Sequence, residues 1–400
     1  MLKRRPLITG AATTLLTPSF ARAAEPAVST GEIRVGNTMP YSGPSASQGM
    51  IGKAEAAFFR MINEQGGLDG RKINFMSLDD QATPSKTLDL TKRLVERDKV
   101  TLMFSMYGTA PNNAVWKYLN QKKVPHLFLF SGSSQWSDYR NHPWTMGWRP
   151  DDRMEARVFG KYIQRARPNG NIGIIYQASE VGMDYIDGIR DVIGAAAMKQ
   201  VPVLLLESAD ATVDPLLARL KDAKVDVLVT ATSPRFASLV LNGLNALAWK
   251  PLHIMSSMSA TPGAVLIPAG PDRAAGIVSA AFAKDPAARD WDDDTGMKEF
   301  RTFMAKYLPA DDPKNPLAAQ GWAVSQTLAH VLKACGKNLS AENIMRQAAG
   351  LNNLANPMLL PGITQSTSKT NYSPLGQMQM VWWNGKAWDR FGDIIEASRG

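Results

Sequence analysis

The chain has 400 residues, of which 44% are hydrophobic, and its net charge is +9 at pH 7. This length exceeds what one hydrophobic core usually supports, so we expect two domains. The lysines and arginines are interleaved with acids and form no basic stripe, which argues against a nucleic-acid-binding protein. Cys335 is the one cysteine, which excludes an intramolecular disulfide.

Residues 1–24 have the plan of a secretory signal peptide. A basic head at 3–5 precedes an uncharged apolar stretch, and residues 21–23 form a small-x-small cleavage site. The pair Arg4-Arg5 is either a twin-arginine export address or an ordinary basic head, and both interpretations stay open. Removal of the signal takes away the four positive charges of Lys3, Arg4, Arg5 and Arg22 and leaves +5. No cysteine for a lipid anchor follows the cleavage site, so we expect a periplasmic protein without a direct membrane anchor.

Strand-like and helix-like stretches then alternate through two similar units, which break near residues 143–150. In the first unit we predict strands at 33–37, 73–78, 101–105 and 126–130, and helices at 53–65, 84–98 and 111–122. In the second we predict helices at 152–165, 183–193, 215–222 and 236–248, and strands at 172–176, 201–206, 225–230 and 252–255. This βαβ rhythm predicts the α/β class, with two doubly wound parallel sheets.

The last third of the chain has a different pattern. We predict a strand at 276–282, helices at 297–307, 318–335 and 341–349, and a hairpin of 377–383 with 387–391. Asn384-Gly385 predicts a primed turn in that hairpin. The acidic run at 290–294 lacks the spacing of a calcium loop and is interpreted as a solvated linker.

Signatures of enzymes and metal sites are largely missing. The four histidines are not paired at metal-ligand spacing, and neither a nucleophile elbow nor a phosphate-binding loop is present. We therefore predict no cofactor, no metal and no catalytic residues.

Three loops rich in glycine and small hydroxyl residues follow predicted strands, at 41–45, 107–111 and 131–134. In an open parallel sheet such loops line the ligand crevice, and the helix N-termini there offer free amides to an anion. The same residue types also cap helices in general. Because two of the loops follow neighbouring strands and precede helices, we favour a binding site for an anionic group.

Several stretches together resemble a known family. They are residues 33–44, the helix that ends at 62–70, Leu78-Asp-Asp80, Val124-Pro125 with residues 131–134, and residues 357–362. The chain resembles periplasmic solute-binding proteins of the leucine/isoleucine/valine-binding type, which serve ABC importers, over residues 32–395. The resemblance implies two α/β lobes joined by three crossings, with the ligand held between them.

Extended, Pro- or Gly-flanked stretches at 148–149, 279–281 and 354–357 are the predicted crossings. Each lobe is then discontinuous in the sequence. Lobe one comprises 32–147 with 283–352, and lobe two comprises 148–278 with 356–396.

The resemblance also implies ligand-binding positions, to which we add neighbouring tyrosines as walls for an apolar or aromatic body. The candidates are Tyr41, Gln48, Tyr107, Gly108, Thr109, Ser131, Gly132 and Ser133 in lobe one, and Tyr176, Asp184, Tyr185, Thr232 and Ser257 in lobe two. Amino-acid binders of the family place an acid near Ser257, where this chain has Met255-Ser-Ser-Met258. An ammonium buried without a counter-charge is costly, so we favour a carboxylate ligand with an apolar or aromatic body. Asp184 and Glu180 remain substitutes for the missing acid.

The expected function is capture of a small organic solute and its delivery to the membrane subunits of an ABC importer, by a monomer that undergoes hinge closure. A branched-chain amino acid is the second choice of ligand. Two other classes stay open: a sensory ligand-binding protein read by a separate partner, and an exported α/β enzyme.

Overall fold

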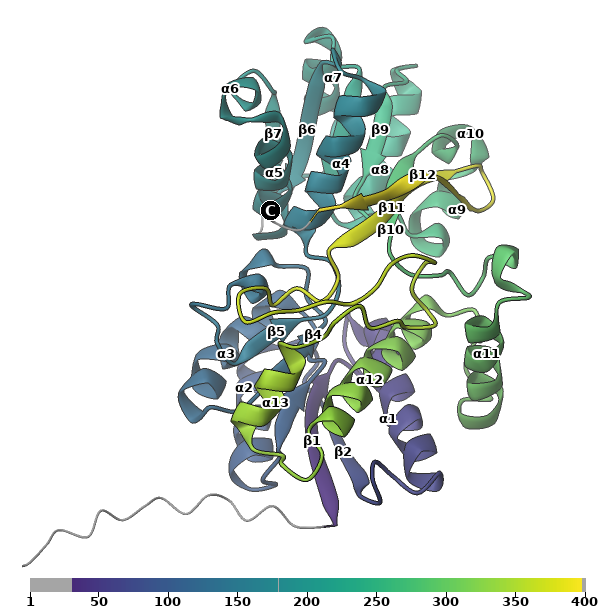
Figure 1. The fold of residues 1–400 in the computed structure, drawn as a ribbon. Helices are drawn as coiled ribbons and strands as arrows, with labels where there is room; N and C mark the ends of the chain where they lie inside the picture. The colour runs from purple at the N-terminus through teal and green to yellow at the C-terminus, as the bar shows by residue number, and fades with distance from the viewer. Residues whose placement is uncertain (1–30, 179, 398–400) are drawn as a thin grey trace, which may run out of the picture.

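The computed structural model describes residues 31–178 and 180–397 as two α/β lobes, one above the other in Figure 1. The predicted signal peptide lies outside the described residues. Within the part that is described, none of the helices has the length and apolar character needed to cross a membrane.

Lobe one is built on a five-stranded parallel sheet. Its order is β2-β1-β3-β4-β5. The strands are β1 (Glu32–Met39), β2 (Lys72–Asp79), β3 (Leu102–Phe104), β4 (His126–Leu129) and β5 (Thr145–Gly147). Residues 35–39 of β1 are buried without interruption, as expected for a central strand covered on both faces. The three-residue strand β5 was missed because it has no apolar run and lies between Pro143 and Pro150.

The helices of lobe one come from two distant parts of the sequence. They are α1 (Gly49–Glu64), α2 (Pro84–Glu96) and α3 (Thr109–Lys122), and then α11 (Thr295–Tyr307), α12 (Pro316–Ala334) and α13 (Ala341–Ala348). In Figure 1 the green α12 lies against the purple α1, and the two helices are in contact. They approach so closely that a Cβ atom on Gly321 would lie 2.5 Å from the carbonyl oxygen of Ile51. This packing attaches the late helices to the first lobe.

Lobe two is built on a seven-stranded mixed sheet of order β12-β11-β10-β9-β8-β6-β7. The parallel strands are β6 (Ile172–Gln177), β7 (Val203–Leu206), β8 (Val227–Ala231), β9 (Leu252–Met255) and β10 (Val278–Ala281). Strands β11 (Gln377–Trp383) and β12 (Trp388–Glu396) add an antiparallel hairpin to one edge. Its helices are α4 (Asp152–Ala166), α5 (Glu180–Ile193), α6 (Ala195–Met198), α7 (Asp214–Asp222), α8 (Pro234–Ala246), α9 (Ile267–Ala269) and α10 (Pro271–Ala274).

The turn of the terminal hairpin differs from the predicted primed turn. The Asn384 backbone N–H donates to the carbonyl of Ala387 at 3.1 Å, and the Asn384 side-chain oxygen accepts from the N–H groups of Lys386 and Ala387 at 2.9 Å each. A type I′ turn centred on Asn384-Gly385 needs positive φ at both residues, but only Gly385 has it, at 97°. The asparagine side chain stabilises a longer loop instead.

The third crossing lies later in the chain than predicted. Residues 356–375, which the sequence analysis assigned to lobe two, bond to lobe one. Thr327 on α12 donates to Gln365 at 2.9 Å, and Tyr372 donates to the Pro143 carbonyl at 3.2 Å. Ser373 shares a 2.5 Å hydrogen bond with Ser137. The chain therefore enters lobe two only at β11, because polar residues of this long loop find their partners on lobe one.

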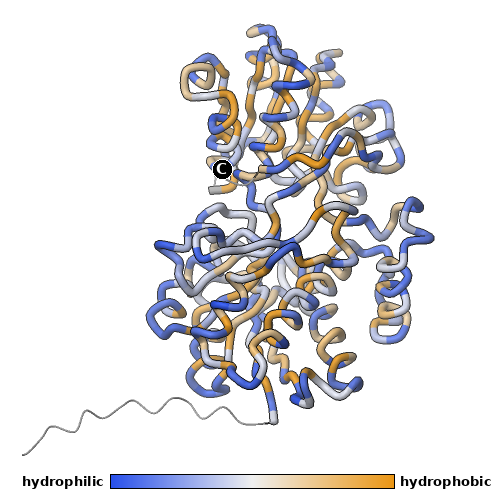
Figure 2. The backbone as a smooth tube through the Cα atoms, in the orientation of Figure 1, coloured by the Kyte–Doolittle hydropathy of each residue, from blue (hydrophilic) through white to orange (hydrophobic). Residues whose placement is uncertain are grey.

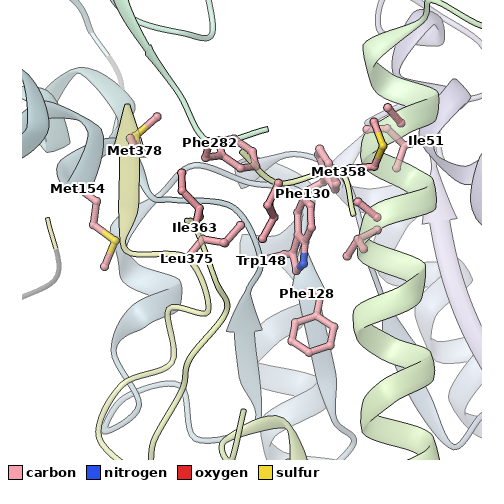
Figure 3. Packing of buried hydrophobic residues seen from close by; sticks show 14 of the residues in the cluster. Ile51, Phe128, Phe130, Trp148, Met154, Phe282, Met358, Ile363, Leu375 and Met378 are labelled. Carbon is pink, nitrogen blue, oxygen red and sulfur yellow. The ribbon is translucent and has the colours of Figure 1, made fainter. Parts of the chain in front are cut away.

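The crossings share one apolar cluster, drawn in Figure 3. Trp148 follows β5, and its ring stacks on Phe130 at a centroid distance of 6.1 Å. Its other neighbour is Phe282, just after β10, whose ring it meets edge-on at 6.1 Å. The Trp148 indole N–H donates to Thr327 on α12 at 3.1 Å. Burial of these large rings fixes where the chain passes between the lobes.

Hydrophobic stretches, orange in Figure 2, run along the strands and the inner faces of the helices in both lobes. One continuous buried cluster joins residues of both sheets through the crossings.

Candidate ligand-binding site

Two hydroxyl groups meet where β3 and β4 end on lobe one. Thr109 begins α3, Ser131 follows β4, and their Oγ1 and Oγ atoms are 2.8 Å apart. The Trp136 indole N–H also donates to Ser131 Oγ, at 2.8 Å. The pair has two hydroxyl protons, and the bond between the two oxygens uses one of them. Gly108 precedes the pair with a φ of 90°, a conformation that favours glycine.

Gly132 is the point at which lobe one touches the first turn of α4. Its carbonyl accepts a 2.8 Å hydrogen bond from the Asp152 backbone N–H. A Cβ atom at Gly132 would lie 2.3 Å from both carboxylate oxygens of Asp152. Only glycine therefore allows this approach. The next residue, Ser133, accepts a hydrogen bond from the Gln135 side chain at 2.9 Å.

Arg149, Asp152 and Glu155 form what we call the charged triad, beside the first crossing. Arg149 Nη2 lies 3.8 Å from Asp152 Oδ1 and 4.0 Å from Glu155 Oε2. Both carboxylate side chains are 1% exposed. Glu155 accepts from the Ser257 backbone N–H and from the Ser257 hydroxyl, at 2.6 Å each. The triad thus links the crossing, α4 and the loop after β9.

Burial controls the ionisation of the triad. It raises the pKa of Asp152 to about 7, although the Arg149 guanidinium opposes the shift. It also raises the pKa of Glu155, against the hydrogen bonds from Ser257 and the charge of Arg149. Burial lowers the pKa of Arg149, but the two neighbouring carboxylates outweigh that effect and raise it. The arginine stays charged, and burial shifts both acids toward their neutral forms.

Three of the candidate tyrosines differ in how far they are buried and in what they contact. Tyr107 is half-buried on lobe one, and the charge of Arg149 acts on its hydroxyl. The ring of Tyr185 is fully buried against Phe159, at a centroid distance of 6.0 Å, so it is a core residue whose hydroxyl faces Glu155. Tyr176 remains half-buried and lines a cavity.

The first-loop candidates stay within lobe one. The Tyr41 hydroxyl shares a 2.5 Å hydrogen bond with Ser77 on β2, and a Cβ atom on Gly52 would lie 2.2 Å from the same hydroxyl oxygen. Gln48 ends the 3-10 turn Ala46–Gln48, and its N–H donates to the Ser45 carbonyl at 2.9 Å. These hydrogen bonds of Tyr41 and Gln48 are made within lobe one.

A cavity of about 610 Å³ opens between the lobes, beside the loop that follows β4. It is lined by Ser133, Ser134, Gln135, Tyr176, Ala178, Met183, Asp184 and Leu205. Across its floor, Asp184 accepts hydrogen bonds from the Ser134 N–H at 2.8 Å and from the Ser134 hydroxyl at 2.5 Å. Burial raises the pKa of Asp184 to about 6. Through its two hydrogen bonds with Ser134, Asp184 of lobe two links the lobes at this edge.

Residues 32–387 match the sequence profile of the family described as periplasmic binding protein. The chain belongs to the periplasmic binding protein family. The family consists of solute-binding proteins, and its members have the two-lobed type I fold found here.

Relatives of this periplasmic binding protein are distant in sequence. Leu/Ile/Val-binding protein homolog 1 of Brucella abortus (strain 2308) is 21% identical over 314 residues, which cover 77% of this chain and 80% of the relative. A branched-chain amino acid ABC transporter protein from Thermus thermophilus, solved with bound valine, superposes with a TM-score of 0.78 at 17% identity over 93% of this chain and 98% of that one. A solute-binding protein from Rhodopseudomonas palustris BisB5, solved with 3,4-dihydroxybenzoic acid, gives 0.72 at 18% identity over 92% and 98%.

The sequence analysis found no acid close to Ser257 in the sequence, but the fold brings Glu155 next to Ser257. Glu155 on α4 reaches the loop after β9 and takes both donors of Ser257. The sequence analysis overlooked Arg149, Asp152 and Glu155, because acids in the first turn of a helix ordinarily serve the helix dipole. The available signal was the i, i+3 spacing of Asp152 and Glu155, which places both acids on the same face of α4.

The remaining candidate is Thr232, and the described residues were also searched for metal-ligand groups. Thr232, just after β8, is 1% exposed, and its hydroxyl has no hydrogen-bond partner among the described residues. Within residues 31–178 and 180–397, no group of three or more His, Cys, Asp or Glu side chains is arranged to hold a metal ion.

Proposed function

We propose that this periplasmic binding protein captures a small organic solute bearing a carboxylate between its two lobes and delivers it to an ABC importer. The observation that carries the proposal is the meeting of the hydroxyl pair of lobe one with the charged triad of lobe two beside the first crossing. A solute that contacts both sets of groups binds only the closed form and shifts the population toward it.

The chemistry of lobe one supports an anionic group on the solute. Thr109 and Ser131 keep one hydroxyl proton for donation, and α3 begins at the same place with N–H groups that have no partner in the helix. Tyr176, Met183 and Leu205 line the adjoining cavity, which suits an apolar or aromatic body. Similar proteins were solved with valine and with 3,4-dihydroxybenzoic acid, and both ligands combine a carboxylate with such a body.

The same proposal includes no covalent chemistry. Burial lowers the pKa of His126 to about 3 and that of His253 to about 4, which keeps both imidazoles neutral in their strands. Burial also raises the pKa of the Cys335 thiol to about 11, so the nucleophilic thiolate is scarce at neutral pH. The basic head and cleavage site of residues 1–24 support export to the periplasm, by the twin-arginine or the general route.

A thermal-shift screen of the purified protein tests the proposal. Amino acids, aromatic acids, amides, short fatty acids and sugars are compared, because a solute that binds the native state must raise the melting temperature. We expect hits among carboxylates with apolar or aromatic bodies and none among sugars. Stabilisation by sugars alone, or by no solute of any class, would contradict the proposed function.

A further inference from the structure

The acidic run at 290–294 surrounds a buried aromatic ring. Trp291 is 7% exposed, whereas the Asp293 side chain is fully exposed and pairs with Lys298 of α11 at 3.0 Å. The sequence analysis interpreted the whole run as a solvated linker. Asp293 is solvated as expected, but the indole within the run is packed against other parts of the chain.

Two cations lie over the Trp291 ring. Lys284 Nζ is 5.2 Å from the ring centroid, and Arg390 Cζ is 4.5 Å from it. Lys284 also donates a 2.7 Å hydrogen bond to Asp294. Arg390 Nη2 lies 3.9 Å from a carboxylate oxygen of Asp290. A cation over an indole face is attracted by the electrons of the ring, and the two acids offset the repulsion between the cations. We call these five residues the Trp291 cluster.

The Trp291 cluster contains residues of both lobes. Asp294 is the N-cap of α11, which belongs to lobe one. Arg390 lies on β12, at the edge of the sheet of lobe two. Strand β12 meets lobe one a second time, since a Cβ atom on Gly362 would lie 2.8 Å from Ile394 Cδ1. The contact of Arg390 with Trp291 therefore joins the lobes outside the three crossings.

The Trp291 cluster and the interlobe cavity lie on different sides of the molecule. In Figure 1, α11 lies at the right, whereas α5 and β7, which help to line the cavity, lie at the left. The lobes thus touch beside the cavity, where Ser134 bonds to Asp184, and again at the α11 side, where Arg390 meets Trp291. A hinge rotation changes the separation of the lobes at both places. The second contact therefore acts on the lobe angle from outside the cavity.

We propose that the Trp291 cluster is an interlobe contact that stabilises the closed arrangement of the lobes and so sets the closed fraction of the protein. Arg390 meets Trp291 in the same structure in which Ser134 bonds to Asp184, so both contacts stabilise the same lobe arrangement. The apparent affinity for a solute scales with the fraction of the protein in the binding-competent form. The inference rests on the hinge closure of the proposed function and is independent of which solute binds.

Pulsed electron paramagnetic resonance on the purified protein, dialysed free of solute, tests the inference. Spin labels are attached at Lys117→Cys on α3 and at Ala196→Cys on α6, which are exposed positions on the two lobes. The native Cys335 is buried and stays unlabelled. In the Arg390→Ala variant, we expect the ratio of long to short label distances to rise about two- to fivefold, the worth of one exposed cation–π contact.

Two further variants control the measurement. Arg301→Ala removes the 2.8 Å ion pair with Asp292 inside lobe one and should leave the distance ratio unchanged. Arg390→Lys keeps a cation for the Trp291 ring and should restore most of the original ratio.

Three outcomes would overturn the inference. They are an unchanged ratio in Arg390→Ala, a shift toward the short distance in that variant, and an equal shift in Arg301→Ala. Each of them leaves the proposed function standing, because the label distance measures lobe separation and not solute binding. Failure of every solute class in the thermal-shift screen counts instead against the proposed function.

Discussion

The two walls of the interlobe site differ in chemistry. Lobe one presents neutral groups on loops, namely the Thr109 and Ser131 hydroxyls and the backbone of Gly132. Lobe two and its crossing present charges, on Arg149 and on the first turns of α4. Neutral donors can accept many anions, whereas buried charges must be matched by the ligand. We therefore propose that lobe one supplies general affinity for a carboxylate and that lobe two supplies discrimination between solutes.

The largest expected effect comes from the point where the two walls touch. Gly132→Ala would put a Cβ atom 2.3 Å from both Asp152 oxygens and so oppose closure. We expect affinity for the solute to fall about a hundredfold, because overpacking of this size penalises the closed form alone. Isothermal calorimetry measures the change. The control is Gly147→Ala, where the added atom meets only an ordinary 3.7 Å contact, and equal losses in both variants would refute the role of this approach.

Removal of a neutral donor from lobe one should have the next largest effect. Thr109→Val keeps the shape but loses the hydroxyl that pairs with Ser131, so affinity should fall about ten- to a hundredfold, the worth of a hydrogen bond to a charge. The melting temperature should change little. Thr302→Val on the exposed side of α11 is the control. Unchanged affinity in Thr109→Val would move the carboxylate site elsewhere.

Asp184 of lobe two predicts a pH dependence that the neutral hydroxyl pair of lobe one does not produce. Burial raises the folded-state pKa of Asp184 to about 6 from an ordinary 3.8. Between those values the native state binds the proton more tightly than the unfolded state, so this contribution to stability is present at low pH and is lost as pH rises through 6. Asp184→Asn removes the titration. Its melting temperature relative to the original should therefore rise by roughly 2–4 °C between pH 4 and pH 7, and a flat difference would contradict the assignment.

The smallest effect is expected at the apolar rim. Tyr176 lines the cavity beside Asp184, and replacement by leucine keeps an apolar surface but removes the ring. We expect a two- to tenfold loss of affinity for an aromatic solute, the usual worth of one ring contact. Titration of Tyr176→Leu measures it against Tyr118→Leu on α3. A loss of a hundredfold or more would show that the rim, and not the triad, dominates discrimination.

The difference between the walls also explains what the sequence could reveal. Loops of glycine and hydroxyl residues after strands are visible in a sequence, so Thr109, Ser131 and Gly132 were among the candidates. The family resemblance was confirmed, as was the two-lobed α/β fold. Arg149, Asp152 and Glu155 were overlooked because acids at helix starts ordinarily serve the helix dipole, and only tertiary packing brings Glu155 to Ser257. The third crossing was misplaced for the same reason, since the partners of Gln365 and Tyr372 are distant in sequence.

A crystal structure with the bound solute tests the central claim most directly. The account predicts one solute between the lobes, in contact with both of them, with its carboxylate within about 3.2 Å of the Thr109 or Ser131 hydroxyl. A solute that contacts a single lobe would contradict it. The alternative place is the cavity of about 500 Å³ between α1 and β2, which Arg60 and Lys72 help to line, and a solute bound there would show that the interlobe cluster is not the binding site.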